Sequence, residues 1–214
     1  MKKESWVEAR RALETGEEMF ALEHSKVAYW TDFAIYAAFI GAMCTALPLF
    51  APRSQWLAMG VLAATGLAAW SPVEYLMHRF VLHGLEPFRS WHARHHERPM
   101  ALISSPTLLS AASIVALVFV PAILFANRWT AASLTVGVVA GYLGYALCHH
   151  GTHHWRARSN WLKERKRWHA IHHRRGGAEC YGVTTKFWDH VFGTVPRDRQ
   201  PEVPSCHADL SNPN

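Results

Sequence analysis

The sequence has little cysteine, and its cysteines follow no recognisable pattern. Four occur in 214 residues (Cys44, Cys148, Cys180 and Cys206), without a paired or metal-binding spacing. This distribution excludes a disulfide framework and a zinc ribbon. Cys44 and Cys148 fall in apolar runs, where a free thiol behaves as a small hydrophobic group.

The N-terminal segment lacks the features of a signal peptide. Residues 1–28 mix charged and apolar positions, without an uninterrupted apolar core or a small-residue cleavage site. Ser5 and Glu8 have the spacing of a capping box, so we predict an amphipathic helix at the membrane surface. A solvated or frayed N-terminus fits the pattern equally well. At the other end, residues 195–214 are predicted to form a flexible tail.

Charged residues are nearly absent from four apolar stretches that are long enough to cross a membrane. These stretches are residues 29–50, 56–70, 107–126 and 130–150, and helical periodicity continues from the second stretch to His83. At about 1.5 Å per residue, the first covers about 33 Å, which suffices for a hydrocarbon core. Pro72 is expected to kink the second span, and Gly137, Gly141 and Gly144 favour close packing of the fourth. We therefore predict an all-α, integral membrane four-helix bundle.

The basic residues indicate how this bundle is oriented. Of 22 Lys and Arg residues, Arg53 and Arg128 alone lie in the two short turns between paired spans. The other 20 lie in three segments that must share one side of the membrane, and the positive-inside rule makes that side cytoplasmic. Both termini are thus predicted to be cytoplasmic. We interpret the net charge of +6 as a signal for orientation and lipid headgroups, and expect no nucleic-acid partner.

Histidine is the residue in excess, because thirteen of fifteen fall between His78 and His190. They form an H-x4-H group, an H-x2-H-H group, the sequence HHGTHH and a second H-x2-H-H group, all on the predicted cytoplasmic side. Within HHGTHH, the spacing allows either His149 with His153 or His150 with His154. The other members of the groups are His78, His83, His92, His95, His96, His169, His172 and His173.

This spacing predicts a cytoplasmic helical cap that holds two metal ions. Residues at i, i+3 and i+4 share a helix face, so each H-x2-H-H group directs at least two imidazoles to one point. Imidazole suits iron, copper, nickel and zinc, whereas calcium and magnesium prefer oxygen ligands. Eight to ten histidines exceed what one ion binds. Zinc could substitute at such a site, but it has no redox role.

The histidine groups, together with YALCHHGTH, WHAIHH and YGVTTKFWDHVFGT, resemble the fatty acid hydroxylase/sterol desaturase superfamily. The chain is most similar to the fatty acid 2-hydroxylase branch, in which the first group reads HRF-x2-H as it does here. The resemblance covers residues 71–194, and residues 29–194 are interpreted as the membrane domain. In the family, an H-x3-H pair commonly follows Tyr-x3, so Tyr145 favours His149 and His153 as ligands.

The resemblance implies a di-iron centre that hydroxylates the acyl chain of a fatty acid or lipid with O2. A desaturase or a sterol- or carotenoid-directed oxidase could use the same centre. A metal-binding transporter or sensor is a different class, and it would need ligands at mid-membrane. No G-x-G-x-x-G motif or cysteine cluster is present, so a separate electron-donor protein is expected.

We predict roles for five further residues. Glu74, near the end of the second span, should face the bundle and have a partner. Asp189 either orients a ligand imidazole or is structural, and His190 beside it is equally open. Trp168 is expected either to exclude water near the site or to anchor at the membrane interface, and the second role is preferred. Arg165 belongs to a basic tail that is predicted either to dock the electron donor or to contact lipid headgroups. The other members of this tail are Lys166, Arg167, Arg174, Arg175 and Lys186.

Overall fold

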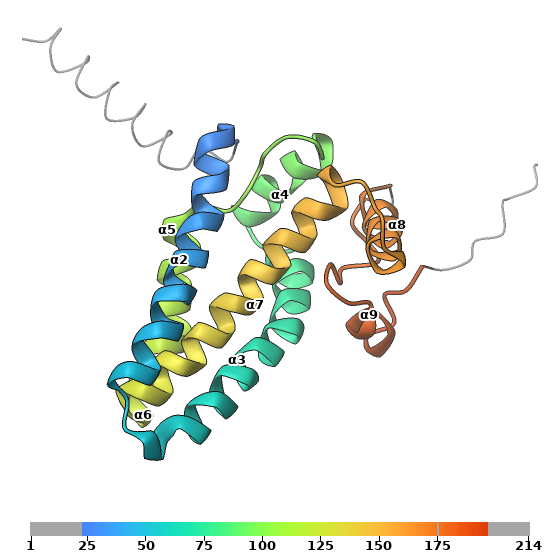
Figure 1. The fold of residues 1–214 in the computed structure, drawn as a ribbon. Helices are drawn as coiled ribbons and strands as arrows, with labels where there is room; N and C mark the ends of the chain where they lie inside the picture. The colour runs from blue at the N-terminus through green and yellow to red at the C-terminus, as the bar shows by residue number, and fades with distance from the viewer. Residues whose placement is uncertain (1–22, 175, 197–214) are drawn as a thin grey trace, which may run out of the picture.

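The computed structural model describes residues 23–174 and 176–196 (Figure 1). The predicted N-terminal surface helix and C-terminal tail therefore lie largely outside the described residues. Within the described ranges, all regular elements are helical, and a single β-bridge joins Glu23 to Ile103.

Four helical stretches are long and apolar enough to cross a membrane, which confirms the predicted all-α fold. The first is α2 (Lys26–Phe50), whose N-terminus is capped by the Ser25 side chain. The second consists of η1 (Arg53–Gln55), α3 (Trp56–Leu76) and η2 (Met77–Leu82). The third consists of α5 (Thr107–Ile114), η3 (Val115–Phe119) and α6 (Val120–Phe125), and the fourth is α7 (Arg128–His154).

Helix α7 lies at the centre of the bundle and packs against α2, α3 and the α5–α6 span. Small residues permit its approach to α3. A Cβ atom at Gly137 would meet the backbone of Ala63, and one at Gly141 would meet the Trp70 side chain. Gly144 faces open space instead. The predicted close packing therefore holds for two of the three glycines.

The outer faces of the spans are apolar. Leu57, Leu108, Leu117, Leu124 and Phe125 are each more than two-thirds exposed. Exposure of so many large apolar side chains on the spans is unfavourable in water and suits contact with lipid chains. The bundle therefore has the surface of a multi-pass membrane protein.

Two spans contain a π-helical segment. In the third span, η3 ends two residues before Pro121, whose nitrogen has no hydrogen to donate to the carbonyl four residues earlier. In the second span, Pro72 lies within α3, which continues to Leu76 before η2 begins.

The remaining helices form a cap at the end of the bundle where η2 and α7 end, opposite the turn between α2 and α3 (Figure 1). They are α4 (Phe88–Glu97), α8 (Asn160–Arg174) and α9 (Phe187–Val191). Helix α4 packs against η2, and α8 packs against α7. The cap is thus attached to the two spans that carry histidines at their ends.

Candidate metal centre

The π-helical segment η2 brings together the histidines of the H-x4-H group. In an α-helix, residues five apart point about 140° away from each other. The i→i+5 hydrogen bonding of a π-helix places such residues one turn apart instead. The imidazole rings of His78 and His83 accordingly lie 5.2 Å apart, centroid to centroid. We did not predict this segment, although a five-residue spacing between two ligands is itself a signal for it.

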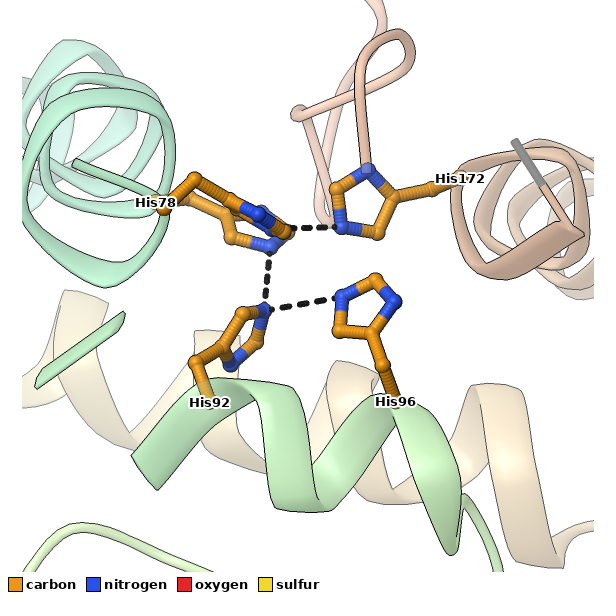
Figure 2. Close-up of side chains that lie close together, drawn as sticks. His78, His92, His96 and His172 are labelled. Atoms are coloured by element: carbon orange, nitrogen blue, oxygen red, sulfur yellow. Dashed lines mark hydrogen bonds between the residues drawn. The ribbon is translucent and has the colours of Figure 1, made fainter. Parts of the chain in front are cut away.

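Five histidines from three elements form the first group. One ring nitrogen of each lies within 4.8 Å of one from every other member. The Nε2 atoms of His78 and His92 are 3.1 Å apart, and those of His83 and His172 are 3.0 Å apart. His96 completes the group, with its Nε2 3.2 Å from that of His92. Figure 2 shows four of these rings directed at a common point.

Four histidines form the second group, again with nitrogens within 4.8 Å of one another: His95, His149, His153 and His169. The Nε2 atoms of His153 and His169 are 2.8 Å apart. His173 lies beside both groups. Its Nε2 is 3.1 Å from that of His169, and its ring stacks on His96 in the first group at 4.2 Å. All ten predicted ligands therefore lie in or against these two groups.

Each H-x2-H-H sequence is divided between the groups. In α4, His92 and His96 belong to the first group and His95 to the second. In α8 the order is reversed, because His172 belongs to the first group and its two neighbours in the motif lie at the second. Residues at i and i+4 stand on one face, whereas i+3 points to the side. Two adjacent helices can therefore build two adjacent sites.

Helix α7 presents only one of its two possible histidine pairs to the second group. His149 and His153 lie in it, with ring centroids 5.0 Å apart. His150 and His154 stack on each other at 4.5 Å, and His150 Nδ1 lies 3.2 Å from the Tyr29 hydroxyl oxygen. The pair in the second group is therefore His149 and His153, the pair that the spacing from Tyr145 favoured.

The donor set fits transition-metal ions. Two ligands about 2.1 Å from one ion at right angles are separated by about 3.0 Å, close to the observed Nε2 separations. Among the described residues, both ring nitrogens of His95 and Nε2 of His149 are buried without a hydrogen-bond partner. Buried polar atoms without a partner are costly, and a bound ion would satisfy one nitrogen of each ring.

Burial keeps these imidazoles neutral. It lowers the pKa of His83, His96 and His173 to about 4, and that of His95 to about 2. Neighbouring imidazoles add to the effect of burial at His83, His95 and His173. A neutral imidazole retains a lone pair for a metal ion, so no proton has to be displaced near pH 7.

Backbone carbonyls fix the orientation of two ligands. His78 Nδ1 donates to the carbonyl oxygen of Tyr181 at 2.6 Å, and His172 Nδ1 donates to that of Glu179 at 2.8 Å. A carbonyl can only accept, so Nδ1 carries the hydrogen and Nε2 faces the group. Contacts of this kind determine the tautomer and ring position of metal-binding histidines.

Asp189 holds the loop that supplies these carbonyls. Its buried carboxylate accepts from the backbone N–H groups of Tyr181 at 2.8 Å and Gly182 at 3.0 Å, and from Trp168 Nε1 at 3.0 Å. Asp189 therefore acts on His78 through the backbone and not by direct contact. Trp168, predicted either to exclude water near the site or to anchor at the membrane interface, is half-buried, and its indole donates to this carboxylate. His190 is exposed and lies outside both groups.

Glu74 holds the same loop from the side of α3. Its carboxylate accepts from the backbone N–H groups of Val183 and Thr184, both at 2.8 Å, and from the Thr184 hydroxyl. The predicted partner of Glu74 is therefore a loop more than 100 residues away in the sequence.

The predicted basic tail is not a continuous surface. Arg165 is only 3% exposed. Lys186 Nζ lies 2.7 Å from Glu164, which compensates its charge. The prediction of Arg165 as a docking residue is wrong, because its side chain does not reach the surface. Arg175 lies outside the described residues.

A cavity of about 120 Å³ reaches both histidine groups from within the bundle. His92 contributes to its wall from the first group, and His95 and His149 from the second. The rest of the wall is mainly apolar and aromatic, with a few polar groups that include Asp32 and Ser104. An acyl chain entering this cavity would lie against both groups.

The profile of the fatty acid hydroxylase family matches residues 63–194, which is more than half of the chain and contains all ten histidines. The chain belongs to the fatty acid hydroxylase family. This confirms the resemblance inferred from the histidine groups. The family comprises membrane lipid hydroxylases, which are oxidoreductases.

Several relatives are named as 2-hydroxylases. The chain is 28% identical to dihydroceramide fatty acyl 2-hydroxylase FAH2 of Arabidopsis thaliana over 80% of this chain and 75% of that protein. It is 30% identical to fatty acid 2-hydroxylase of Rattus norvegicus, over 72% of this chain and 44% of that protein. It is 32% identical to ceramide very long chain fatty acid hydroxylase scs7 of Schizosaccharomyces pombe, over 60% of this chain and 40% of that protein. The chain thus spans less than half of the latter two.

A solved structure shares the fold. The full-length scs7p structure, in which only the hydroxylase domain is visible, superposes with a TM-score of 0.69. The match covers 84% of this chain and 70% of that one, at 23% identity.

Proposed function

We propose that this protein is a membrane-bound di-iron oxygenase that hydroxylates the acyl chain of a fatty acid or lipid. The observation that carries the proposal is the pair of adjacent, all-imidazole groups on the wall of a mainly apolar cavity. The names of the relatives, which act on fatty acids or ceramides, support the substrate class.

Iron ions bound at the two groups would supply the activation of O2 that attack on an unactivated C–H bond requires. The chain's own residues would hold the metal ions and orient the imidazoles that bind them. The ten histidines would ligate as neutral imidazoles, and the carbonyls of Tyr181 and Glu179 keep two of them directed at the first group. Phe33, Phe88 and Trp91 in the cavity wall exclude water from the acyl chain.

Hydroxylation with O2 consumes two electrons and two protons per product and releases one water. Since the sequence contains no motif for a redox cofactor besides the histidine groups, we propose that a separate protein donates the electrons. We place the cap on the cytoplasmic side, as the distribution of Lys and Arg favours. Soluble electron donors and O2 would reach the centre there.

A desaturase would use the same centre, so the product has to be identified directly. Lipids from a host that expresses the protein should gain 16 Da on their acyl chains, as measured by mass spectrometry against a host with the empty vector. A loss of 2 Da would indicate desaturation instead. An unchanged lipid profile with transport of metal ions would favour the transporter, although the histidines lie at the ends of the spans and not at mid-membrane.

A further inference from the structure

The first histidine group contains an imidazole whose outer nitrogen no hydrogen bond orients. His78 and His172 each donate from Nδ1 to a backbone carbonyl oxygen. Within the described ranges, no such bond holds Nδ1 of His83, although its Nε2 lies 3.0 Å from that of His172 at the group. His83 also directly follows η2, so its backbone stands at the end of the helical segment. Packing therefore has to keep this ring in place.

Two glycines close the end of α8 beside that ring. The helix ends at Arg174, Gly176 has a left-handed φ of +63°, and the Gly177 N–H donates to the His172 carbonyl oxygen at 2.9 Å. This is the geometry of a Schellman motif. In such a motif, the side chain at the position of Gly177 frequently packs against the residue whose carbonyl it binds, here His172. Gly177 has no side chain to place there.

The imidazole of His83 occupies the space that a side chain at Gly177 would need. A Cβ atom built on Gly177 would overlap Cε1 of the His83 ring and lie 2.7 Å from Nδ1 and 3.0 Å from Nε2. These are the three nearest atoms to that position, apart from those of chain neighbours. A Cβ atom on Gly176 would meet no atom of the described residues within 4 Å, chain neighbours again apart. The two glycines therefore share the left-handed backbone, but Gly177 alone lies against a ligand.

We propose that Gly177 is a positioning residue of the metal centre. Its missing side chain lets the His83 ring lie against the end of α8, where its Nε2 meets that of His172. A methyl group at this position would displace the ring and remove one of the five donors of the first group. The second group does not contain His83 and would keep its donors. The proposal rests on the metal centre described under the proposed function, but not on the identity of the reaction.

The test is a titration of Co²⁺ into metal-free, full-length protein in detergent, followed by the absorption of the bound ion. Imidazole sites bind Co²⁺, and its affinity can be measured against a competing chelator. Gly177→Ala should bind one of the two ions about 10- to 100-fold more weakly and the other as the wild type does. The matched control is Gly176→Ala, which introduces an alanine at a similar φ, +63° against +72°. It should lower the unfolding temperature of the metal-free protein about as much, but bind both ions as the wild type does.

A second pair of variants keeps the test decisive if Gly177→Ala misfolds. In His83→Ala the ring is absent, so the methyl group of Gly177→Ala/His83→Ala has no imidazole to displace. This double variant should fold and bind Co²⁺ as His83→Ala does. Wild-type binding by Gly177→Ala, an equal loss in Gly176→Ala, or a further loss in the double variant would overturn the proposal. A wild-type protein that binds no Co²⁺ would overturn the metal centre itself.

Discussion

Replacing His172 by alanine is expected to abolish product formation while leaving the protein folded in the membrane. The side chain is completely buried, and its Nε2 lies 3.0 Å from that of His83 in the first group. The substitution removes one of five nitrogen donors. Loss of a group that only contacts a metal ligand typically lowers metal affinity or activity about 10- to 100-fold. For loss of a ligand itself, we therefore expect activity to fall at least about 100-fold. The measurement is hydroxylated lipid formed by equal amounts of detergent-purified protein.

The matched control for this variant is His190→Ala. His190 is also a histidine of the cap, but it is exposed and lies outside both groups. We expect wild-type activity from it. Product formation by His172→Ala at more than about a tenth of the wild-type rate would show that the first group is not where the reaction takes place.

The second large effect is expected at one of two consecutive histidines in α7. His149→Ala should also reduce activity by at least about 100-fold, because His149 lies in the second group and in the wall of the cavity. His150→Ala should retain most of the activity, because the His150 ring stacks on His154 and contacts Tyr29 instead. The same assay measures both variants.

This pair tests the choice between the two registers of HHGTHH. Each variant loses the same side chain from the same helix, so a general effect on the insertion of α7 would lower both activities equally. If His150→Ala were the inactive variant and His149→Ala the active one, the other register would supply the ligands, and the second group would have to be rebuilt around His150 and His154.

The spans and the histidine groups were predictable because they depend on local sequence. The length of an apolar run gives the length of the helix that it forms, and a spacing of three or four residues places two side chains on one helix face. The four helices appear where the runs predicted them, and the ten histidines converge. The end of α4 at Glu97 also follows from local sequence, because Pro99 comes two residues later and a proline disfavours a helical conformation in the residue before it.

What the sequence could not show depends on contacts between distant residues. The roles of Glu74 and Asp189 arise from a loop that meets the end of α3 only after the chain has folded. The burial of Arg165 depends on the same packing, and basic composition alone suggested a surface residue. The π-helical segment η2 was missed for a different reason: apolar periodicity over six residues does not separate it from an α-helix, and the signal lay in the five-residue spacing of His78 and His83.

The central claim, that the histidines form two metal-binding groups, is tested most directly by counting metal ions per chain. The protein would be purified in detergent, treated with a weak chelator to remove loosely bound ions, and measured by inductively coupled plasma mass spectrometry. We predict about two ions per chain, with iron as the metal in protein that is active. One ion per chain, or none, in folded protein would contradict the account.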